Sequence, residues 1–211
     1  MKIFGYWRSS CSYRVRIAFA LKGVSFENRP VHLLKGDQKD PEFLEKNPMG
    51  QVPTLVLDDG RILAQSMAIL DYLDVRFPEP PLYPREPFER ARVLQLAEIV
   101  NAGIQPLQNS YVLLRLSDAG VDSGTFARDM LERGLGALER ELVHTAGRYA
   151  FGDRVTAADV LLVPQMYNAR RFDLDMSGFP TAVRVDDEAR KLPAFFAARP
   201  EVQPDAPPDG P

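Results

Sequence analysis

The first third of the chain alternates short apolar runs with stretches of helical periodicity. Residues 2–7 form an apolar run that is typical of a strand. A helical pattern follows as far as the stop signal Lys22-Gly23, and its apolar positions are Val15, Ile17, Ala18 and Leu21. The pattern predicts a strand and then a helix that begins near Ser10 or Cys11.

Residues 26–33 alternate apolar and polar side chains around Arg29-Pro30. This predicts an edge strand beside the first one, because proline cannot donate a hydrogen bond to a central ladder. A short helix through Phe43 and Leu44 should follow. It should end at the breaker cluster of residues 47–50.

Two further strands are expected over residues 52–57 and 61–63, joined as a tight hairpin by Asp58-Asp59-Gly60. An amphipathic helix then starts after Ser66, its expected N-cap, and its apolar positions are Met67, Ile69, Leu70, Tyr72, Leu73 and Phe77. The resulting order, β-α-β-α-β-β-α, predicts an N-terminal α/β domain of the thioredoxin-like type.

Prolines mark a change of organisation after this domain. Five of them lie between residues 78 and 87, where they cannot belong to a helix interior and indicate a stiff connector. Strand signals disappear beyond it. We therefore expect a thioredoxin-like domain over 1–78, a proline-rich linker over 79–87 and an all-α helical domain over 88–211.

Within the second domain, one helical face extends from Val93 to Leu116, with a kink expected near Pro106. A second helix over 126–142 should pair with it in antiparallel orientation, and another helix is expected over 182–192. The proline-rich tail from Pro200 has no period and is expected to lie extended on the surface.

Thr156 and Asp159 have the spacing of a capping box, and Val155 and Val160 stand at the two positions of a hydrophobic staple. The helix that follows is mostly apolar as far as Asn168. It is predicted to be the buried centre of the helical domain.

The composition excludes several classes of function. A formal charge of −3 gives no reason to propose nucleic acid or a membrane surface as a partner. Cys11 is the only cysteine, so neither an intrachain disulfide nor a thiolate metal cluster can form, and His32 and His144 lack metal-binding spacing. No metal is expected. With no signal peptide and no run approaching ~18 apolar residues, we expect a cytoplasmic protein.

Candidate chemistry gathers at Ser9, Ser10 and Cys11, where the first helix begins. Hydroxyls there can accept hydrogen bonds from backbone N–H groups, whereas the N–H groups and the helix dipole favour an anion. The segment could therefore cap itself or hold a thiolate. Cys11 could also be a nucleophile, as in thiol oxidoreductases, or simply be packed. Because no second cysteine can resolve a mixed disulfide, Cys11 ranks as a supporting residue. Ser9 is the first choice for the hydroxyl, with an ordinary N-cap as its alternative role.

Residues 1–30 carry a local excess of positive charge, because Glu27 stands alone against Lys2, Arg8, Arg14, Arg16, Lys22 and Arg29. This favours a small anionic ligand near the first helix. For Arg14 and Arg16, a solvated helix face explains the charge equally well.

The decapeptide Ser9-Ser10-Cys11-Ser12-Tyr13-Arg14-Val15-Arg16-Ile17-Ala18 resembles the N-terminal signature of zeta-class glutathione transferases, with Tyr13 where many members carry tryptophan. Segments similar to further class motifs follow in the same order, at residues 47–54, 65–66, 103–109 and 163–172. The resemblance covers both domains. It implies the cytosolic glutathione transferase architecture, glutathione as cofactor and a homodimer.

The resemblance also implies roles for individual residues. Ser9, Ser10 and Cys11 would form the catalytic group. Contacts with glutathione would come from Gln38, Val52, Gln65, Ser66, Gln105 and Asn109. Val52 precedes Pro53, at the family's position before a cis-proline, while capping alone could explain Ser66. Arg8 and Arg171 would bind a substrate carboxylate. A solvated helix end is the alternative for Arg171 and for its neighbour Arg170.

Such proteins catalyse glutathione-dependent cis-trans isomerisation of maleylacetoacetate or maleylpyruvate, which are dicarboxylate-type substrates. A thiolate adds to the cis double bond, rotation follows, and expulsion regenerates glutathione; arginines would stabilise the charge that develops. Two alternatives stay open. One is conjugation, dehalogenation or reduction of small electrophiles, and the other is a non-catalytic binding module. The sequence does not choose between the two acids.

Overall fold

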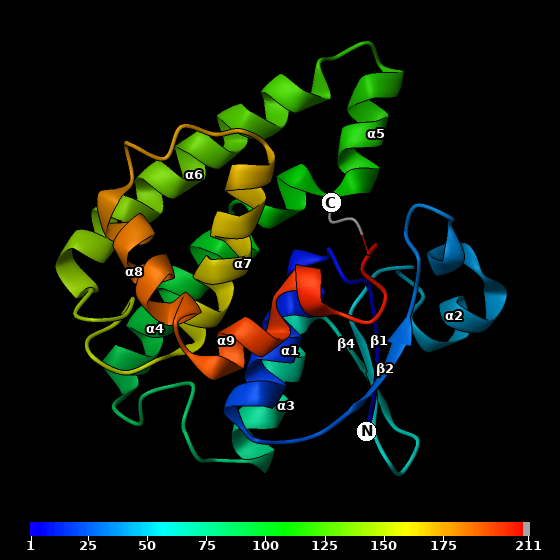
Figure 1. The fold of residues 1–211 in the computed structure, drawn as a ribbon, viewed down its shortest axis with the longest axis horizontal. Coiled ribbons are helices and arrows are strands. Elements are labelled where there is room, and N and C mark those ends of the chain that lie inside the picture. The colour runs from blue at the N-terminus through cyan, green and yellow to red at the C-terminus, as the bar shows by residue number, and fades with distance from the viewer. Residues whose placement is uncertain (209–211) are drawn as a thin grey trace. The chain divides into compact units, whose positions relative to one another are not determined.

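The computed structural model describes residues 1–208 (Figure 1). Contacts divide the chain into two compact units. One consists of Met1–Pro80 together with the segment from Pro193 onward, and the other of Pro81–Leu192. The C-terminal segment thus groups with the N-terminal unit and not with the helical unit that it follows in sequence. The domain limits expected above, 1–78, 79–87 and 88–211, stay a prediction.

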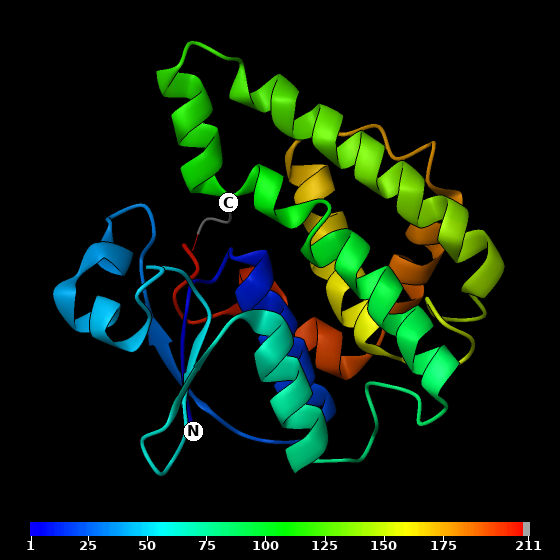
Figure 2. The same cartoon turned by 180° about the vertical axis from the view of Figure 1, so that it is seen from behind.

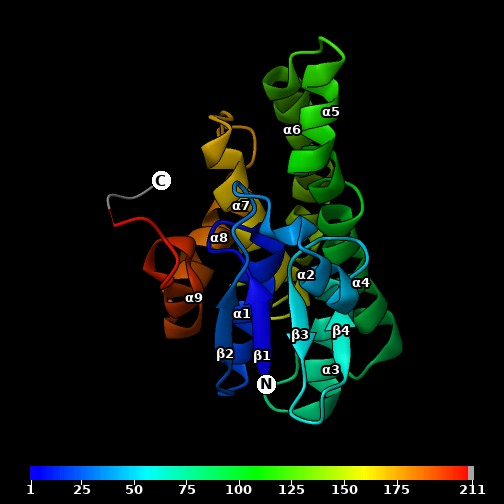
Figure 3. The ribbon, with the colours of Figure 1, turned by 90° about the vertical axis from the view of Figure 1, so that its right-hand side faces the viewer.

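A four-stranded sheet with the order β2-β1-β3-β4 forms the centre of the first unit. The strands are β1 Lys2–Gly5, β2 Glu27–Pro30, β3 Thr54–Val56 and β4 Ile62–Ala64. β1 runs parallel to β2 and antiparallel to β3, and β3 and β4 form the expected hairpin (Figure 3). The prediction of a proline-containing edge strand beside the first strand is confirmed.

Helices cover the sheet on both faces. Their bounds are α1 Ser10–Leu21, the 3-10 turn η1 Asp37–Lys39, α2 Pro41–Lys46 and α3 Ser66–Arg76. α1 and α3 contact each other on one face, whereas α2 lies on the other (Figures 1 and 2). Apolar side chains of the sheet, of α1 and of α3 form the core, among them Ile3, Ile17, Leu55, Ile69 and Leu70. The thioredoxin-like order of elements is confirmed.

The C-terminal segment from Pro193 onward differs from the prediction in two places: an unexpected helix lies before Pro200, and the tail from Pro200 begins with a 3-10 turn and not as an extended chain. It forms α9 Pro193–Ala198 and a 3-10 turn, η3 Pro200–Val202, and α9 contacts α1. Phe195 is fully buried and Pro200 is also buried, so apolar burial and not proline content decides the path of the chain here. Residues 209–211 of the expected tail lie outside the described residues.

The second unit is helical. Its elements are α4 Pro87–Asn101, the 3-10 turn η2 Gln105–Gln108, α5 Ser110–Asp118, α6 Ser123–Thr145, α7 Ala157–Arg171 and α8 Pro180–Arg190. α7 contacts both α4 and α8, and nearly all of its residues are buried, which confirms it as the centre of this unit. The capping box of Thr156 and Asp159 is present as predicted.

The prediction of one helix kinked near Pro106 is wrong. The chain breaks into α4, η2 and α5, because Pro106 has no amide hydrogen to continue the helical hydrogen bonding and a new helix must be started. Asn109 starts it, since its Oδ1 accepts a hydrogen bond from the Tyr111 amide at 3.0 Å.

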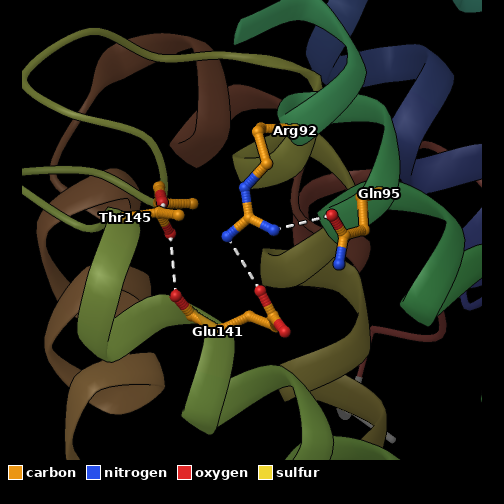
Figure 4. Close-up of polar contacts among 5 residues, drawn as sticks. Arg92, Gln95, Glu141 and Thr145 are labelled. Atoms are coloured by element: carbon orange, nitrogen blue, oxygen red, sulfur yellow. Dashed lines mark hydrogen bonds and ion pairs between the residues drawn. The ribbon is translucent and has the colours of Figure 1, made fainter. Parts of the chain in front are cut away.

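A polar cluster ties α4 to α6 (Figure 4). The Arg92 guanidinium donates to Gln95 Oε1 at 2.7 Å and to Glu141 Oε2 at 2.8 Å. Thr145 Oγ1 donates to the backbone oxygen of Glu141 at 3.2 Å. Of these bonds, the Arg92–Glu141 ion pair is the one that joins the two helices, and at this partly buried surface such a pair contributes modestly to stability.

Candidate active site

The sheet of the first unit brings most of the candidate residues to one of its ends. Phe4 of β1 lies opposite Thr54 of β3, and Thr54 lies opposite Ala64 of β4. The chain leaves β1 toward Ser9, enters β3 from Val52-Pro53 and leaves β4 at Gln65. Since β2 is parallel to β1, the segment toward Gln38 also leaves from this end. Sequence reasoning named these residues, and the strand pairing gathers them.

Ser9 stands at the N-cap of α1 in extended conformation, and its Oγ accepts a hydrogen bond from the Ser12 amide at 3.2 Å. This bond uses a lone pair, so the hydroxyl hydrogen is left to donate to a ligand. The cap takes up the Ser12 amide, and the Ser10 and Cys11 amides belong to the same first turn, where N–H groups lack intrahelical partners. Ser10 is buried and Cys11 is partly exposed.

The loop before β3 carries a cis peptide bond between Val52 and Pro53, at the position singled out in the sequence. Asn47 organises this loop, because its Nδ2 donates to the Gln51 backbone oxygen at 2.7 Å and its Oδ1 accepts from the Met49 amide at 3.2 Å. Gly50 has a φ of 59°, and a Cβ there would lie 3.0 Å from the backbone oxygen of Gln38. The loop therefore lies directly against Gln38.

α3 begins differently from the expectation. Its N-cap is Gln65, with a φ of 72° and no capping bond from its side chain, and Ser66 is the first helical residue. The prediction of Ser66 as N-cap is wrong by one position, because Gln65 holds the non-helical cap conformation and Ser66 is already helical. The Ser66 hydroxyl contacts another side chain. Its Oγ accepts a hydrogen bond from Arg14 Nη1 at 3.1 Å in the buried interior.

Arg14 and Arg16 are both buried, so the interpretation of a solvated helix face is wrong for either residue. Two residues apart, they point to roughly opposite sides of α1. Arg14 reaches Ser66 of α3, and Arg16 Nε donates to the Ala198 backbone oxygen at 3.0 Å in α9. Sequence reasoning missed this role, because only the burial of both sides of α1 distinguishes it.

In the second unit, Gln105 is the first residue of η2 and Asn109 follows its last residue. Asn109 caps α5, as described above, and Gln105 is partly exposed. A residue that sequence reasoning did not single out lies between them: Gln108 is buried, and its Nε2 donates to Gln165 Oε1 of α7 at 2.8 Å. This bond fixes η2 beside α7.

Arg170 and Arg171, at the end of α7, have different roles. Arg170 pairs with the buried Asp186 of α8, with Nη2 and Oδ2 2.6 Å apart. Burial raises the pKa of Asp186, and the charge of Arg170 opposes that rise. Arg171 is exposed and donates to Asn168 Oδ1 at 3.1 Å. Of the two, Arg171 is therefore the one held at the surface.

The sheet end of the first unit fits a peptide-like anionic ligand. The first turns of α1 and α3 present backbone amides and the positive end of a helix dipole. In addition, Gln38 Oε1 is buried without a hydrogen-bond partner among residues 1–208 and can accept from a ligand N–H group. A thiolate at Ser9 and a carboxylate at α3 would use these groups.

Two kinds of site are not found in the described part of the chain. No cluster of three or more His, Cys, Asp or Glu side chains there could hold a metal ion. Nor is any helix between residues 1 and 208 long and apolar enough to span a membrane.

Comparison with known proteins gives the same picture. Residues 8–76 match the family model described as glutathione S-transferase, N-terminal domain. The chain is 44% identical to a probable maleylacetoacetate isomerase 2 of Drosophila melanogaster over 99% of its length and 92% of the relative's. It is 46% identical to glutathione S-transferase Z1 of Arabidopsis thaliana over 98% of its length and 95% of the relative's.

Among solved structures, a maleylacetoacetate isomerase from Anaeromyxobacter dehalogenans with glutathione bound in its active site is 48% identical. It superposes with a TM-score of 0.91 over 98% of this chain and 97% of that one. Sequence identity at this level over nearly the whole length of both chains establishes that the proteins are homologous. The chain belongs to the glutathione S-transferase family, in the zeta class that includes the maleylacetoacetate isomerases.

Proposed function

We propose that this protein is a glutathione-dependent cis-trans isomerase of maleylacetoacetate or maleylpyruvate. The observation that carries the proposal is the convergence of the Ser9 cap, the cis Val52-Pro53 loop and the start of α3 at one sheet end. The relative crystallised with glutathione in its active site supports the choice of cofactor. Maleylpyruvate is included as a candidate substrate because a maleylpyruvate isomerase of the zeta class is 38% identical to this chain, with a TM-score of 0.95.

Ser9 is the proposed thiolate-stabilising residue, with Ser10 and Cys11 beside it. A thiol has an ordinary pKa near 8.5, so a pKa about two units lower needs about 2.7 kcal/mol in favour of the thiolate. A charge-assisted hydrogen bond from the Ser9 hydroxyl contributes about 1.5–3 kcal/mol, and the start of α1 adds about 0.3–1 kcal/mol. Together the two effects are large enough.

The remaining polar groups would hold the tripeptide. The backbone of Val52 would pair with its central residue, and the Gln38 oxygen would accept from one of its N–H groups. The first turn of α3, with Gln65 and Ser66, would receive a carboxylate. Gln105 and Asn109 are proposed as further contacts from the helical unit.

When bound, glutathione supplies the thiolate that adds reversibly to the cis double bond. The chain's own part is to orient the acid and to stabilise charge. We assign the substrate carboxylates to Arg8, next to Ser9, and to Arg171, because a guanidinium binds a carboxylate in bidentate fashion and stays charged. Fixed cations near the reacting atoms also stabilise the enolate charge that develops.

The wider setting is proposed on the same basis. Residues 1–78 would bind glutathione and the helical domain would bind substrate. We further propose a cytoplasmic homodimer without nucleic-acid or membrane partners, which sedimentation equilibrium and cell fractionation test. A monomeric mass at micromolar concentration would contradict the dimer.

The function is tested by assaying the purified protein with both acids, with and without glutathione. Formation of the trans isomer only when glutathione is present is the expected result. If neither acid is isomerised but an electrophile is conjugated or dehalogenated, the alternative transferase function holds. Retention on immobilised glutathione without any turnover would instead indicate a binding module.

A further inference from the structure

The turn of Tyr6, Trp7 and Arg8 delivers Ser9 to the start of α1, and its peptide groups are held from several directions. The Tyr6 amide donates to Ser12 Oγ at 3.3 Å, and the Ser9 amide donates to the Tyr6 oxygen at 3.0 Å. These two bonds are local. Those made by Trp7 are not.

The Trp7 amide donates to Asp205 Oδ2 at 2.8 Å, across 198 positions of the sequence. The same carboxylate lies 3.5 Å from Asn28 Nδ2 through its other oxygen. On the carbonyl side, Arg16 Nη2 donates to the Trp7 oxygen at 2.9 Å, and Nη1 lies 3.5 Å from the Tyr6 oxygen. Both sides of Trp7 are thus held by charged side chains.

Arg16 also joins the turn to the C-terminal segment. Its Nε donates to the Ala198 oxygen, and Tyr13 donates through its hydroxyl to the Phe195 oxygen at 3.3 Å. The contacts of α9 with α1 bring this segment to the turn (Figure 1). Arg16 is 5% exposed, so its charged hydrogen bonds are made in a protected environment where they hold geometry firmly.

We infer that Asp205 and Arg16 are positioning residues for Ser9, and that the C-terminal segment acts on the turn before Ser9 through Asp205 and the Ala198 oxygen. The inference rests on the proposed function of Ser9. The two side chains touch neither the thiol nor the acid. They fix the peptide planes on both sides of Trp7 and thereby the position from which the Ser9 hydroxyl meets the thiol. A displacement of the order of 1 Å is enough to slow a positioned reaction.

The test compares Asp205→Ala and Asp205→Asn with Glu201→Ala, a matched removal of an exposed carboxylate from the same segment. Trp7 is the only tryptophan, so intrinsic fluorescence reports directly on the turn. For Asp205→Ala we expect a red-shifted emission and easier quenching. We also expect kcat to fall about tenfold, with KM for glutathione changed less than about threefold.

The pKa of the bound thiol, followed by thiolate ultraviolet absorbance, should rise by about one unit in Asp205→Ala. Asp205→Asn retains an oxygen for the Trp7 amide and should stay within about twofold of wild type in kcat. Arg16→Lys tests the same turn from its carbonyl side, because an ammonium cannot span the Trp7 and Ala198 oxygens as the guanidinium does. It should reproduce the loss seen with Asp205→Ala.

Wild-type kcat and thiol pKa in Asp205→Ala and Arg16→Lys would overturn the inference, as would equal losses in Glu201→Ala. The readouts also separate this inference from the proposed function. Fluorescence and thiol titration require only bound glutathione. If the wild-type protein ionises glutathione without isomerising either acid, the proposed function fails while these two measurements still decide the role of Asp205.

Discussion

The Ser9 hydroxyl can serve two partners at once. Its oxygen caps α1 by accepting from the Ser12 amide, and its hydrogen is free of that bond by the chemistry of a hydroxyl. Capping and thiolate stabilisation are therefore not competing explanations of this residue. The cap fixes the oxygen, and the hydroxyl hydrogen can rotate toward a ligand.

Replacing Ser9 by Ala should remove both functions. We expect kcat/KM for isomerisation to fall about 100-fold, as when one preorganised donor to a developing anion is lost. The free energy of unfolding should fall by about 1 kcal/mol because the cap is lost. Steady-state kinetics and denaturant unfolding measure the two effects separately.

Asp122→Ala is the matched control, because Asp122 caps α6 by accepting from the Gly124 and Thr125 amides in the other unit. It should cost a similar free energy of unfolding, about 1 kcal/mol, with kcat/KM unchanged. Equal activity of Ser9→Ala and wild type would remove Ser9 from the mechanism. A comparable loss in Asp122→Ala would show that stability alone explains the effect.

At the scale of single residues, the sequence indicated which residues could belong to the site, but not which groups those residues and their neighbours contact. Ser9, Gln65 and Ser66 follow from helix-start patterns and from the resemblance, but Arg14 and Arg16 could not be assigned. A charged residue on a helix carries no mark of what covers it. Only the packing of α3 and α9 against α1 determines that both guanidinium groups are buried.

The start of α7 is an element whose stability depends on pH. Asp159 accepts hydrogen bonds from the Thr156 amide at 2.8 Å and from the Ala150 amide at 2.7 Å. Burial nevertheless raises the pKa of Asp159 from 3.8 to about 6, because desolvation of the carboxylate outweighs these bonds. The folded chain therefore keeps this proton to a higher pH than the unfolded chain.

Because the pKa of Asp159 is higher in the folded chain than in the unfolded chain, the protonated form of Asp159 favours the folded state. This contribution to the free energy of unfolding is lost as the pH rises and the folded state must give up the proton. Its contribution to the free energy of unfolding should fall by about 3 kcal/mol between about pH 4 and pH 6 and then level off. Asp159→Asn lacks this titration. The difference in unfolding free energy between wild type and variant should therefore decrease across this range.

Urea unfolding at several pH values measures that difference, and the exposed Asp129→Asn on α6 is the reference for removal of a surface carboxylate. A difference for Asp159→Asn that stays constant or grows with pH would mean that the carboxylate is not held in its protonated form.

Elements with strong local signals were predicted, and those without were not. The capping box of α7 and the hairpin of β3 and β4 each depend on a few residues that are close together in the sequence. The break between α4 and α5 was mistaken for a kink, because the same apolar period continues through both helices. α9 is only six residues long and was missed, since its apolar residues gain stability from α1 and not from their own periodicity.

On the scale of the whole molecule, the order of the helices and strands in the N-terminal unit could be predicted. The packing of the C-terminal segment against that unit could not. Tyr13 and Phe195 bond across 182 positions, and Trp7 and Asp205 across 198. Contacts at such separations leave no periodic trace in a single sequence. They nevertheless join the C-terminal segment to the unit that carries Ser9. The candidate thiolate-stabilising residue therefore lies in a unit built from both ends of the sequence.

The measurement that tests the central claim most directly is the yield of trans acid when glutathione is limiting. An isomerase regenerates the thiol at each turnover, so product should exceed the added glutathione many-fold while free thiol stays constant. Product formation that stops at one equivalent of glutathione, with the thiol consumed, would show a transferase and contradict the account.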